Sequence, residues 1–318
     1  MIRVGVIGAG PNGTGNAAGL AKFTDRCRIT AVADPVPVAA EKLAAIYGAK
    51  TFASPAQLAG EVDAVVISSP NFMHREHALA MAAAGKHLFI EKPMALNLAD
   101  ADAIVAAVEK AKVHSLIGFS VRFGGLPVQM KKMYQAGDLG DFVSLWSRRL
   151  CALNVPAGNW RAQYEKSGGV MAELITHEID FAVNIVGMPS TVYCRKLSTL
   201  NDHPKANDHI WLTMGYKNGA TCTIEGSQIA TVADYYKGMT GTKGGLHSRN
   251  WQSELYFGKT QSEAERVTLP ADIDKHRHFL DVLAGECPSV ADAKYGRDIT
   301  LICEKALESG ATGQAQTL

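Results

Sequence analysis

Short apolar runs alternate with longer amphipathic stretches along the first 120 residues. The runs are typical of buried strands, and the stretches have the period of helices. The predicted strands are 2–7, 29–33, 64–68, 87–90 and 115–119, and helices are predicted after the glycines near residue 10, at 74–85 and at 98–111. Strands that alternate with helices indicate a parallel, doubly wound α/β sheet, whose ligands bind at the carboxyl ends of its strands.

A different pattern follows residue 120. The candidate strands there are 142–152, 190–199, 208–216, 220–229 and 252–257, with one long helical segment at 170–187. At 318 residues the chain exceeds what one ordinary hydrophobic core covers, so two domains are expected. We place the first at 1–120 and the second at 121–318.

Composition narrows the class of protein. The chain is 47% apolar and 20% charged, which is typical of a globular protein. A net charge of +1 without a long run of Lys and Arg argues against binding to nucleic acid or to a membrane surface. The six cysteines have no C-x-x-C spacing, which favours free thiols in a reducing compartment. Since the N-terminus has no secretory pattern, a cytoplasmic location is expected.

A glycine turn directly follows the first predicted strand. In dinucleotide-binding turns the first glycine permits a tight bend, the second lets the backbone approach the pyrophosphate, and the third lets helix and strand pack closely. The phosphates then lie at the N-terminus of the helix, which favours anions. The residues predicted to hold the cofactor here are Gly8, Gly10, Pro11, Asn12 and Gly13. A glycine-rich turn that binds nothing is the alternative.

An acidic residue ends the second predicted strand. Asp34 lies 21 residues after Gly13, where its carboxylate can accept hydrogen bonds from ribose hydroxyls and would repel a 2′-phosphate. The following residues, 35–38, include no Arg or Lys that could bind such a phosphate. The sequence therefore predicts NAD as the cofactor, in preference to NADP.

Polar residues follow three further predicted strands. They are Ser69, Pro70 and Asn71, then Glu91 and Lys92, then Arg122. Because the carboxyl ends of parallel strands meet at one edge of the sheet, these residues are candidates for the site.

Lys92 suits the oxidation of an alcohol. This reaction needs a hydride acceptor at the carbon and a proton acceptor at the hydroxyl. An ammonium group can stabilise the alkoxide oxygen, and a lysine with a lowered pKa can take the proton. The alternative is a solvated surface lysine.

The helix predicted at 170–187 has one polar stripe. At 100° per residue, Glu173, His177, Asp180 and Asn184 fall on one side, and most other positions are apolar. A histidine flanked by carboxylates is held in orientation and made more basic, so the stripe predicts a catalytic His177. A solvated edge, or a histidine that the acids merely satisfy, is the alternative.

Several stretches together resemble the glucose–fructose oxidoreductase / inositol dehydrogenase / rhizopine-catabolism (Gfo/Idh/MocA) family. They are GVIGAGPNG, SSPNFMHREHALAMAAAGKHLFIEKPMAL, GFSVRF, NWR, GGVMAELITHEID and MTGTKGGL, and they extend over nearly the whole chain. The resemblance implies a Rossmann domain followed by an α+β domain with a large, mostly antiparallel open sheet. It also implies an NAD(P)-dependent dehydrogenase or reductase of sugars and polyols, and a homodimer or homotetramer formed through that sheet.

The resemblance also implies roles for single residues. Lys92 matches the family's catalytic lysine, in a Lys–Pro step that is often cis, and His74 matches a PN-x-x-H element near the cofactor. His177 and Asp180 match the end of an Asp, His, Asp pattern, in which Glu173 replaces the first Asp.

The residue two before that histidine is usually glycine and here is Ile175, which adds bulk beside the predicted pocket. Candidates for substrate contacts, besides Lys92 and His177, are Arg122, Trp160, Arg161 and Tyr236. Cations and aromatic faces suit substrates with hydroxyl or carboxylate groups, although each of these residues could equally serve packing.

No metal site is predicted. The histidines near 74–77 and at 276 and 278 lack convergent further ligands, and we interpret the second pair as the start of a surface helix. Neither H-E-x-x-H nor G-x-S-x-G occurs, so a zinc protease or serine hydrolase has no support.

Three functional hypotheses remain open at this point. The leading one is an NAD-dependent dehydrogenase or reductase of a sugar, cyclitol or related polyol. The second is an NAD-dependent glycosidase that works by transient oxidation and elimination. The third is a non-catalytic NAD-binding regulator, against which the presence of both Lys92 and His177 argues.

Overall fold

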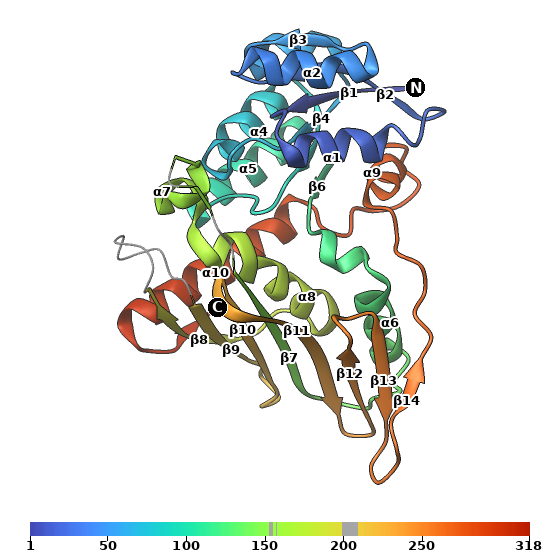
Figure 1. Ribbon diagram of the computed structural model, residues 1–318, viewed down its shortest axis with the longest axis vertical. Helices are drawn as coiled ribbons and strands as arrows, with labels where there is room; N and C mark the ends of the chain where they lie inside the picture. Colours follow the sequence, from blue (N-terminus) through green and yellow to red (C-terminus); the bar gives the residue numbers. More distant parts are fainter. Residues whose placement is uncertain (153–154, 157, 199–208) are drawn as a thin grey trace. The chain divides into compact units, whose positions relative to one another are not determined.

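The computed structural model describes residues 1–318 except 153–154, 157 and 199–208. The chain divides into two compact units (Figure 1). The first unit contains Met1–Gly118 and Asp274–Thr300, and the second contains Phe119–Ile273 and Leu301–Leu318.

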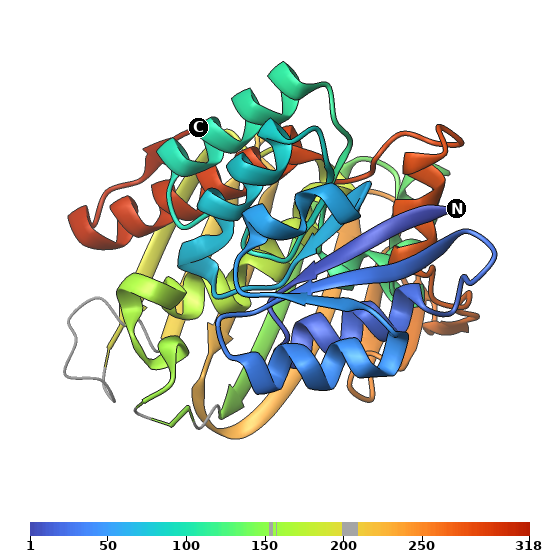
Figure 2. The same ribbon diagram turned by 90° about the horizontal axis from the view of Figure 1, so that it is seen from above.

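The first unit is a parallel sheet with helices on both faces. Its strands have the order β3-β2-β1-β4-β5-β6, and Figure 2 shows α1 and α2 along one face and α4 and α5 along the other. The elements in chain order are β1 (Ile2–Ile7), α1 (Pro11–Leu20), β2 (Cys27–Ala33), α2 (Pro37–Tyr47), β3 (Lys50–Phe52), α3 (Pro55–Leu58), β4 (Ala64–Ile67), α4 (His74–Ala83), β5 (His87–Ile90), α5 (Leu98–Ala111), β6 (Ser115–Ile117), α9 (Lys275–Leu283) and the first part of α10 (Ala293–Thr312). The predicted doubly wound α/β architecture is confirmed.

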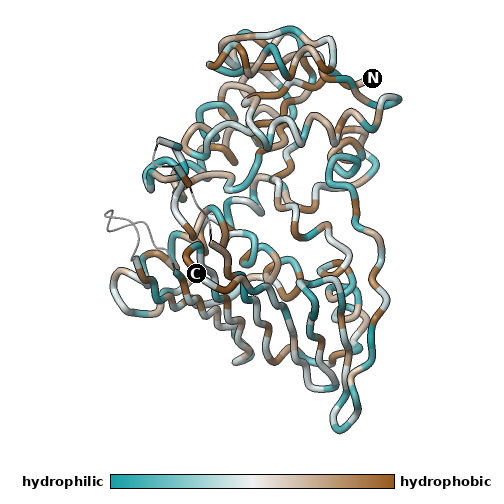
Figure 3. The backbone as a smooth tube through the Cα atoms, viewed as in Figure 1, coloured by the Kyte–Doolittle hydropathy of each residue, from teal (hydrophilic) through white to brown (hydrophobic). Residues whose placement is uncertain are grey.

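The central strands of this sheet are largely apolar because helices cover both faces, and β4 (AVVI) is apolar and buried along its whole length. Val4 and Val6 of β1 and Phe89 of β5 are fully buried, and Figure 3 shows hydrophobic stretches within the first unit. The strand order reverses between β1 and β4, the two neighbouring parallel strands at the middle of the sheet. From there β2 and β3 extend to one edge, and β5 and β6 extend to the other. In such folds the ligand binds outside the carboxyl ends of the strands at this reversal.

The first unit also takes in a late segment of the chain. Residues 121–318 were expected to form one domain, whereas Asp274–Thr300 packs with residues 1–118. The amide of Ile117 donates to the carbonyl of Ala291, and the amide of Ala293 donates to the hydroxyl of Ser115. Contacts between segments this far apart leave no periodic signal in the sequence.

The second unit is built on a nine-stranded sheet. Among the described strands the order is β14-β13-β12-β11-β7-β10-β9-β8-β15, and every neighbouring pair is antiparallel except β7 with β10. The elements are α6 (Gly125–Gln135), β7 (Phe142–Ala152), α7 (Tyr164–Ser167), a π-helical turn (Met171–Ile175), α8 (Thr176–Val186), β8 (Thr191–Leu197), β9 (His209–Gly215), β10 (Thr221–Ser227), β11 (Ile229–Gly241), β12 (Gly245–Arg249), β13 (Glu254–Gly258), β14 (Glu265–Val267), the last part of α10, and β15 (Gln316–Thr317). The prediction of a mostly antiparallel sheet is confirmed.

The two faces of this sheet differ. One face packs against helices: the amide of Cys194 on β8 donates to Ser309 of α10, and α8 contacts β7 and β10. The other face carries exposed large side chains, among them Tyr193, Leu197 and Trp211. Such alternation, apolar on the packed face and mixed on the other, is what a sheet with one covered face requires.

Several elements of the second unit differ from the sequence prediction, which did not include α6, β12 or β14. The long strand β11 was not predicted, because a buried lysine and Gly238 interrupt its apolar alternation. The helix predicted at 170–187 is divided into a π-helical turn at Met171–Ile175 and α8. A π-helical turn has more residues per turn than an α-helix, so the 100° spacing does not hold through Glu173. Among the described residues no helix is long and apolar enough to cross a membrane.

Candidate active site

The glycine turn after β1 has the shape that a dinucleotide requires. Gly8 has φ +95°, and a Cβ there would lie 2.7 Å from the backbone of Ser68 and Ser69. A Cβ on Gly13 would lie 1.8 Å from the carbonyl oxygen of Gly8. Beside Gly10, in contrast, no heavy atom lies within 4 Å of the Cβ position. The turn is therefore tightly packed at Gly8 and Gly13 and open at Gly10, where the phosphates need space.

The N-terminus of α1 suits an anion. Gly10 is its N-cap residue, Pro11 begins the helix, and no side chain caps the free N–H groups. These groups and the helix dipole favour a negatively charged ligand. The residues present thus fit the pyrophosphate of a dinucleotide.

Asp34 is held beside this turn. Its carboxylate accepts hydrogen bonds from the amide of Ala9 at 2.7 Å and from the amide of Val36 at 2.8 Å. The carboxylate is therefore fixed at the end of β2, next to the glycine turn, where the adenosine ribose lies in this class of fold.

The segment after β4 is held to the segment after β5 by His74. The Nδ1 atom of His74 lies 2.7 Å from the carbonyl oxygen of Pro93, and Nε2 lies 2.9 Å from that of Ser69. Ser69 also contacts Nδ1 of His77 through its hydroxyl, at 2.9 Å. His74 is almost fully buried, as is Asn71. We therefore interpret His74 as a residue that positions these two loops.

Lys92 follows β5 as predicted and belongs to the first unit. The peptide bond between Lys92 and Pro93 is cis. The preceding Glu91 is buried, and its carboxylate accepts a hydrogen bond from Asn16 of α1 at 2.8 Å. Asn16 was not among the predicted site residues, because it lies inside α1, past the glycine turn, where no motif singles it out.

In the second unit, the predicted histidine and its flanking acids have defined surroundings. His177 and Asp180 are buried on α8. Asp180 forms a buried ion pair with Arg122, whose Nε donates to Oδ1 at 3.1 Å. Asn184, the next polar position along the helix, accepts from Lys131 at 2.8 Å.

Glu173 pairs with another candidate. The Nε atom of Arg161 donates to its carboxylate at 3.2 Å, and the guanidinium of Arg161 lies 4.9 Å from the ring centre of Trp160. Glu173 and Asp180, the two acids of the predicted polar stripe, thus each have an arginine partner. Tyr236 lies on β11 with 44% of its surface exposed. The substrate roles of these residues stay predictions.

A buried charge cluster lies on the other side of α8. Glu178 and Lys237 form a fully buried ion pair, and the carboxylate also accepts from Arg149 and Tyr235, each at 3.2 Å. Burial raises the pKa of Glu178, but the cations Lys237 and Arg149 outweigh burial and hold it below its usual range. Glu178 was not among the predicted site residues, because it lies outside the polar stripe.

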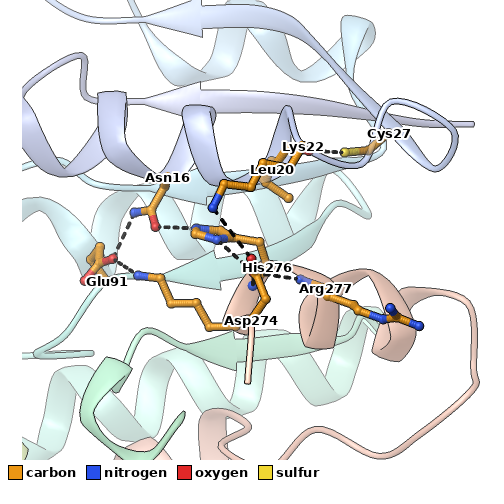
Figure 4. Close-up of polar contacts among 9 residues, drawn as sticks. Asn16, Leu20, Lys22, Cys27, Glu91, Asp274, His276 and Arg277 are labelled. Carbon is orange, nitrogen blue, oxygen red and sulfur yellow. Dashed lines mark hydrogen bonds and ion pairs between the residues drawn. The ribbon is translucent and has the colours of Figure 1, made fainter. Parts of the chain in front are cut away.

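The interpretation of residues 276 and 278 as the start of a surface helix was partly wrong. Helix α9 does begin there, at Lys275, but His276 is buried against α1. Its Nε2 atom lies 2.9 Å from the side-chain oxygen of Asn16 (Figure 4). Among the described residues no group of three or more His, Cys, Asp or Glu side chains could hold a metal ion.

Comparison with known proteins identifies the family that the sequence motifs resemble. Residues 2–119 match the family described as "Oxidoreductase family, NAD-binding Rossmann fold", and residues 128–247 match the GFO/IDH/MocA C-terminal domain. The chain is 30% identical to myo-inositol 2-dehydrogenase of Thermotoga maritima, with 96% of each chain covered. It is 28% identical to inositol 2-dehydrogenase of Rhizobium meliloti, over 78% of this chain and 76% of that protein.

Another relative has a different activity in its name. The chain is 29% identical to 2,7-anhydro-N-acetylneuraminate hydratase of Escherichia coli, over 77% of this chain and 67% of that protein. Among solved structures, levoglucosan dehydrogenase in complex with NADH and levoglucosan has a TM-score of 0.90 and 22% identity, with 99% of each chain covered. At this identity the likeness concerns the fold. The glycine turn, the strand order and these matches together show that the chain belongs to the Gfo/Idh/MocA oxidoreductase family, with an NAD-binding Rossmann fold.

Proposed function

We propose that this protein transfers a hydride between NAD and a secondary hydroxyl or carbonyl carbon of a sugar, cyclitol or related polyol. The observation that carries the proposal is Lys92, two residues after the end of β5, at the carboxyl edge of the parallel sheet of an NAD-binding oxidoreductase. That edge is where ligands bind in this class of fold.

The first unit holds the cofactor in this proposal. The open side of the glycine turn and the uncapped N-terminus of α1 receive the pyrophosphate. Asp34 accepts the ribose hydroxyls, since its carboxylate is already fixed beside Ala9. The loops after β4 and β5, which include Ser69, Pro70, Asn71 and Glu91, line the nicotinamide half. Bound NAD supplies the hydride acceptor.

Lys92 and His177 act on the substrate hydroxyl in this proposal. One of them takes the proton that leaves the oxygen, and the other stabilises the negative charge that develops there. Glu173 and Asp180, with their partners Arg161 and Arg122, fix the surroundings of His177. Trp160 and Tyr236 offer aromatic surfaces for the substrate.

The substrate class follows from the relatives. Two of them are named as inositol dehydrogenases, and one solved structure is named as levoglucosan dehydrogenase in complex with NADH and levoglucosan. Polyols and sugars present secondary hydroxyls, the group on which the proposed hydride transfer acts.

We also propose a homodimer or homotetramer formed through the exposed face of the second sheet. Large apolar patches rarely stay exposed on a monomer, and Tyr193, Leu197 and Trp211 lie on this face. Each of the six cysteines is a free thiol, which suits the cytoplasm.

The test begins with a screen. Polyols, aldoses and glycosides are incubated with NAD, and the absorbance of NADH is followed. We expect net NADH with one or more free sugars or cyclitols. Cleavage of a glycoside without net NADH would contradict a dehydrogenase and favour transient oxidation.

Two variants then test the roles of the proposed residues. Lys92→Ala and His177→Ala should each lower kcat by about 10²–10⁴-fold, which is typical for loss of a general acid or base. Lys294→Ala is the matched control, because Lys294 pairs with Glu109 on the exposed surface of the first unit. Near-normal turnover of either variant would overturn the mechanism.

A further inference from the structure

A glycine in the second sheet makes room for the turn that carries His177. Gly226 lies in β10 with an extended backbone that any residue could adopt. Glycine weakens a strand, and one common reason for its presence there is the close approach of another group. A Cβ at Gly226 would lie 2.2 Å from Cδ1 of Ile175 and 3.5 Å from Cδ2 of Leu174. The side chain of Ile175 therefore fills the space that a side chain at position 226 would take, which we call the Gly226 notch.

Ile175 directs its bulk at the sheet. It was expected to add bulk beside the predicted pocket, but its side chain is fully buried and lies against β10. Ile175 is the last residue of the π-helical turn, and its φ of −65° and ψ of −33° are helical. The 100° spacing therefore holds from this residue into α8 (Figure 1). Ile179, one turn later on the same side, is also fully buried, so the two isoleucines form the sheet-facing side of this turn.

Glu178 and Thr176 hold the same turn from two other directions. The Glu178 carboxylate pairs with the buried Lys237 of β11 and accepts from the hydroxyl of Ser147 of β7 at 2.5 Å. Thr176 forms a side-chain hydrogen bond with Cys303 of α10. Positions 175, 176 and 178 are therefore held by different elements of the second unit, namely β10, α10, and β7 with β11.

His177 lies on the remaining side of the turn. At 100° per residue it is about 200° from Ile175, so its side chain leaves the helix on the side away from the Gly226 notch. We infer that Ile175 and Gly226 are a positioning pair for His177: the isoleucine in the notch fixes the rotation of the first turn of α8 and so the direction of the imidazole. The inference rests on the proposed role of His177.

The first test fills the notch. Gly226→Val places a branched side chain where a single Cβ would already lie 2.2 Å from Ile175, so the helical turn must move away from the sheet. Because a displacement of about 1 Å can lower turnover about 10²-fold, kcat should fall about tenfold or more. The affinity for NAD should stay unchanged, since the glycine turn lies in the first unit. Gly226→Ala should cause a smaller loss of the same kind.

The second test moves the bulk from the helix to the strand. The double variant Gly226→Val with Ile175→Ala has the same total number of side-chain carbon atoms as the wild-type pair. It should restore kcat to within about threefold of wild type, because swaps that conserve volume are tolerated best. Ile175→Ala alone leaves the notch empty and should also lower kcat. A double variant that turns over no faster than Gly226→Val would overturn the pairing.

Gly215 of β9 is the matched control for strain in the sheet. A Cβ there would lie 2.6 Å from Oγ1 of Thr191 on β8, and the register with β10 places Gly215 on the opposite face from Gly226. Gly215→Ala should lower the free energy of unfolding, measured by tryptophan fluorescence in urea, and leave kcat unchanged. Every kcat is measured without urea, with the polyol or sugar that gives the most NADH in the screen.

A spectroscopic signal follows His177 without turnover. The chain has 10 histidines, and in protein labelled with ¹³C at histidine Cε1 the signal of His177 is identified by its loss in His177→Gln. At a single pH, Gly226→Val should shift this signal, and the double variant with Ile175→Ala should return it toward its wild-type position. Gly215→Ala should leave it in place.

Turnover and signal test the two proposals separately. If His177→Ala turns over normally while the signal shifts and returns as expected, the proposed role of His177 is wrong and the positioning pair stands. If His177→Ala is inactive while Gly226→Val keeps the wild-type kcat and signal and loses only stability, the positioning pair is wrong and the proposed function stands. Should Gly226→Val fail to fold, the same outcomes are decided with Gly226→Ala.

Discussion

Ionisable groups are arranged differently in the two units. In the second unit, Glu178 is fully buried and accepts from Lys237, Arg149, Tyr235 and Ser147. In the first unit, the charged groups lie at strand ends: Asp34 accepts from two backbone amides, and Glu91 has Asn16 and Lys275 on one oxygen.

The difference separates structural charges from functional ones. Every lone pair direction of the Glu178 carboxylate is used by the protein, so the cluster fastens α8 to the sheet and has no capacity for a ligand. The Asp34 carboxylate, in contrast, is only partly buried and lies beside the glycine turn, where it accepts from the amide of Ala9. His177 and Glu178 are neighbours in the sequence, yet Glu178 faces the sheet while His177 belongs to the polar stripe of α8.

The largest expected effect concerns the buried pair. Lys237→Met leaves Glu178 as a buried charge with fewer partners and should destabilise the second unit by about 3–5 kcal/mol. All four tryptophans lie between residues 146 and 251, so tryptophan fluorescence during urea unfolding reports on this unit.

Lys305→Met is the matched control, because Lys305 forms a partly exposed pair with Glu308 in the same unit. Lys305→Met should lower the free energy of unfolding by about 1 kcal/mol or less. Replacing both Glu178 and Lys237 by Met should recover part of the loss of the single variant, since the uncompensated charge is then absent. Equal losses of stability for Lys237→Met and Lys305→Met would show that the buried pair stabilises the second unit no more than the partly exposed pair does.

The second prediction uses pH to probe the first unit. Burial, and then the charge of Lys275, lower the pKa of His276 from its usual 6.5 to about 4 in the folded protein. As the pH falls, the unfolded chain therefore binds the proton before the folded protein does. The contribution of neutral His276 to the free energy of unfolding is complete above pH 6.5 and is lost as the pH falls toward 4. The slope is at most about 1.4 kcal/mol per pH unit for one proton.

Hydrogen exchange of peptides from α9, at pH 5 and pH 7, measures this loss. His276→Gln keeps a donor for Asn16 but does not titrate, so it should flatten the dependence. Burial also lowers the pKa of His77 and His87, and these contributions cancel when the variant is compared with wild type. Identical pH dependence in both proteins would contradict a neutral, buried His276.

The smallest expected effect concerns cofactor choice. We expect NAD to bind at least about tenfold more tightly than NADP, or about 1.4 kcal/mol, because Asp34 repels a 2′-phosphate. Calorimetric titration with both cofactors measures this difference. The double variant Asp34→Ala with Val36→Arg should narrow it, and equal affinities in the wild-type protein would show that Asp34 does not select the cofactor.

Much of the first unit could be predicted from local sequence. The strand at 2–7 and the glycine turn were predicted with their correct bounds, since a buried parallel strand is a continuous apolar run and Gly8 and Gly13 are required by the backbone itself. In the second unit, β7 was predicted at its observed bounds, but β11 was missed. Strand β11 contains a buried lysine that is stable only because Glu178 lies opposite.

The sequence by itself determined the doubly wound fold, the NAD turn and the position of Lys92 after β5, because each depends on residues close together in the chain. Only the tertiary structure decided that Asp274–Thr300 joins the first unit, that Asn16, Lys275 and His276 surround Glu91, and that Asp180 pairs with Arg122. These partners are separated by 58 to 260 residues. Hydrogen bonds and ion pairs over such separations depend on how the helices pack, and no periodic pattern in the sequence encodes that packing.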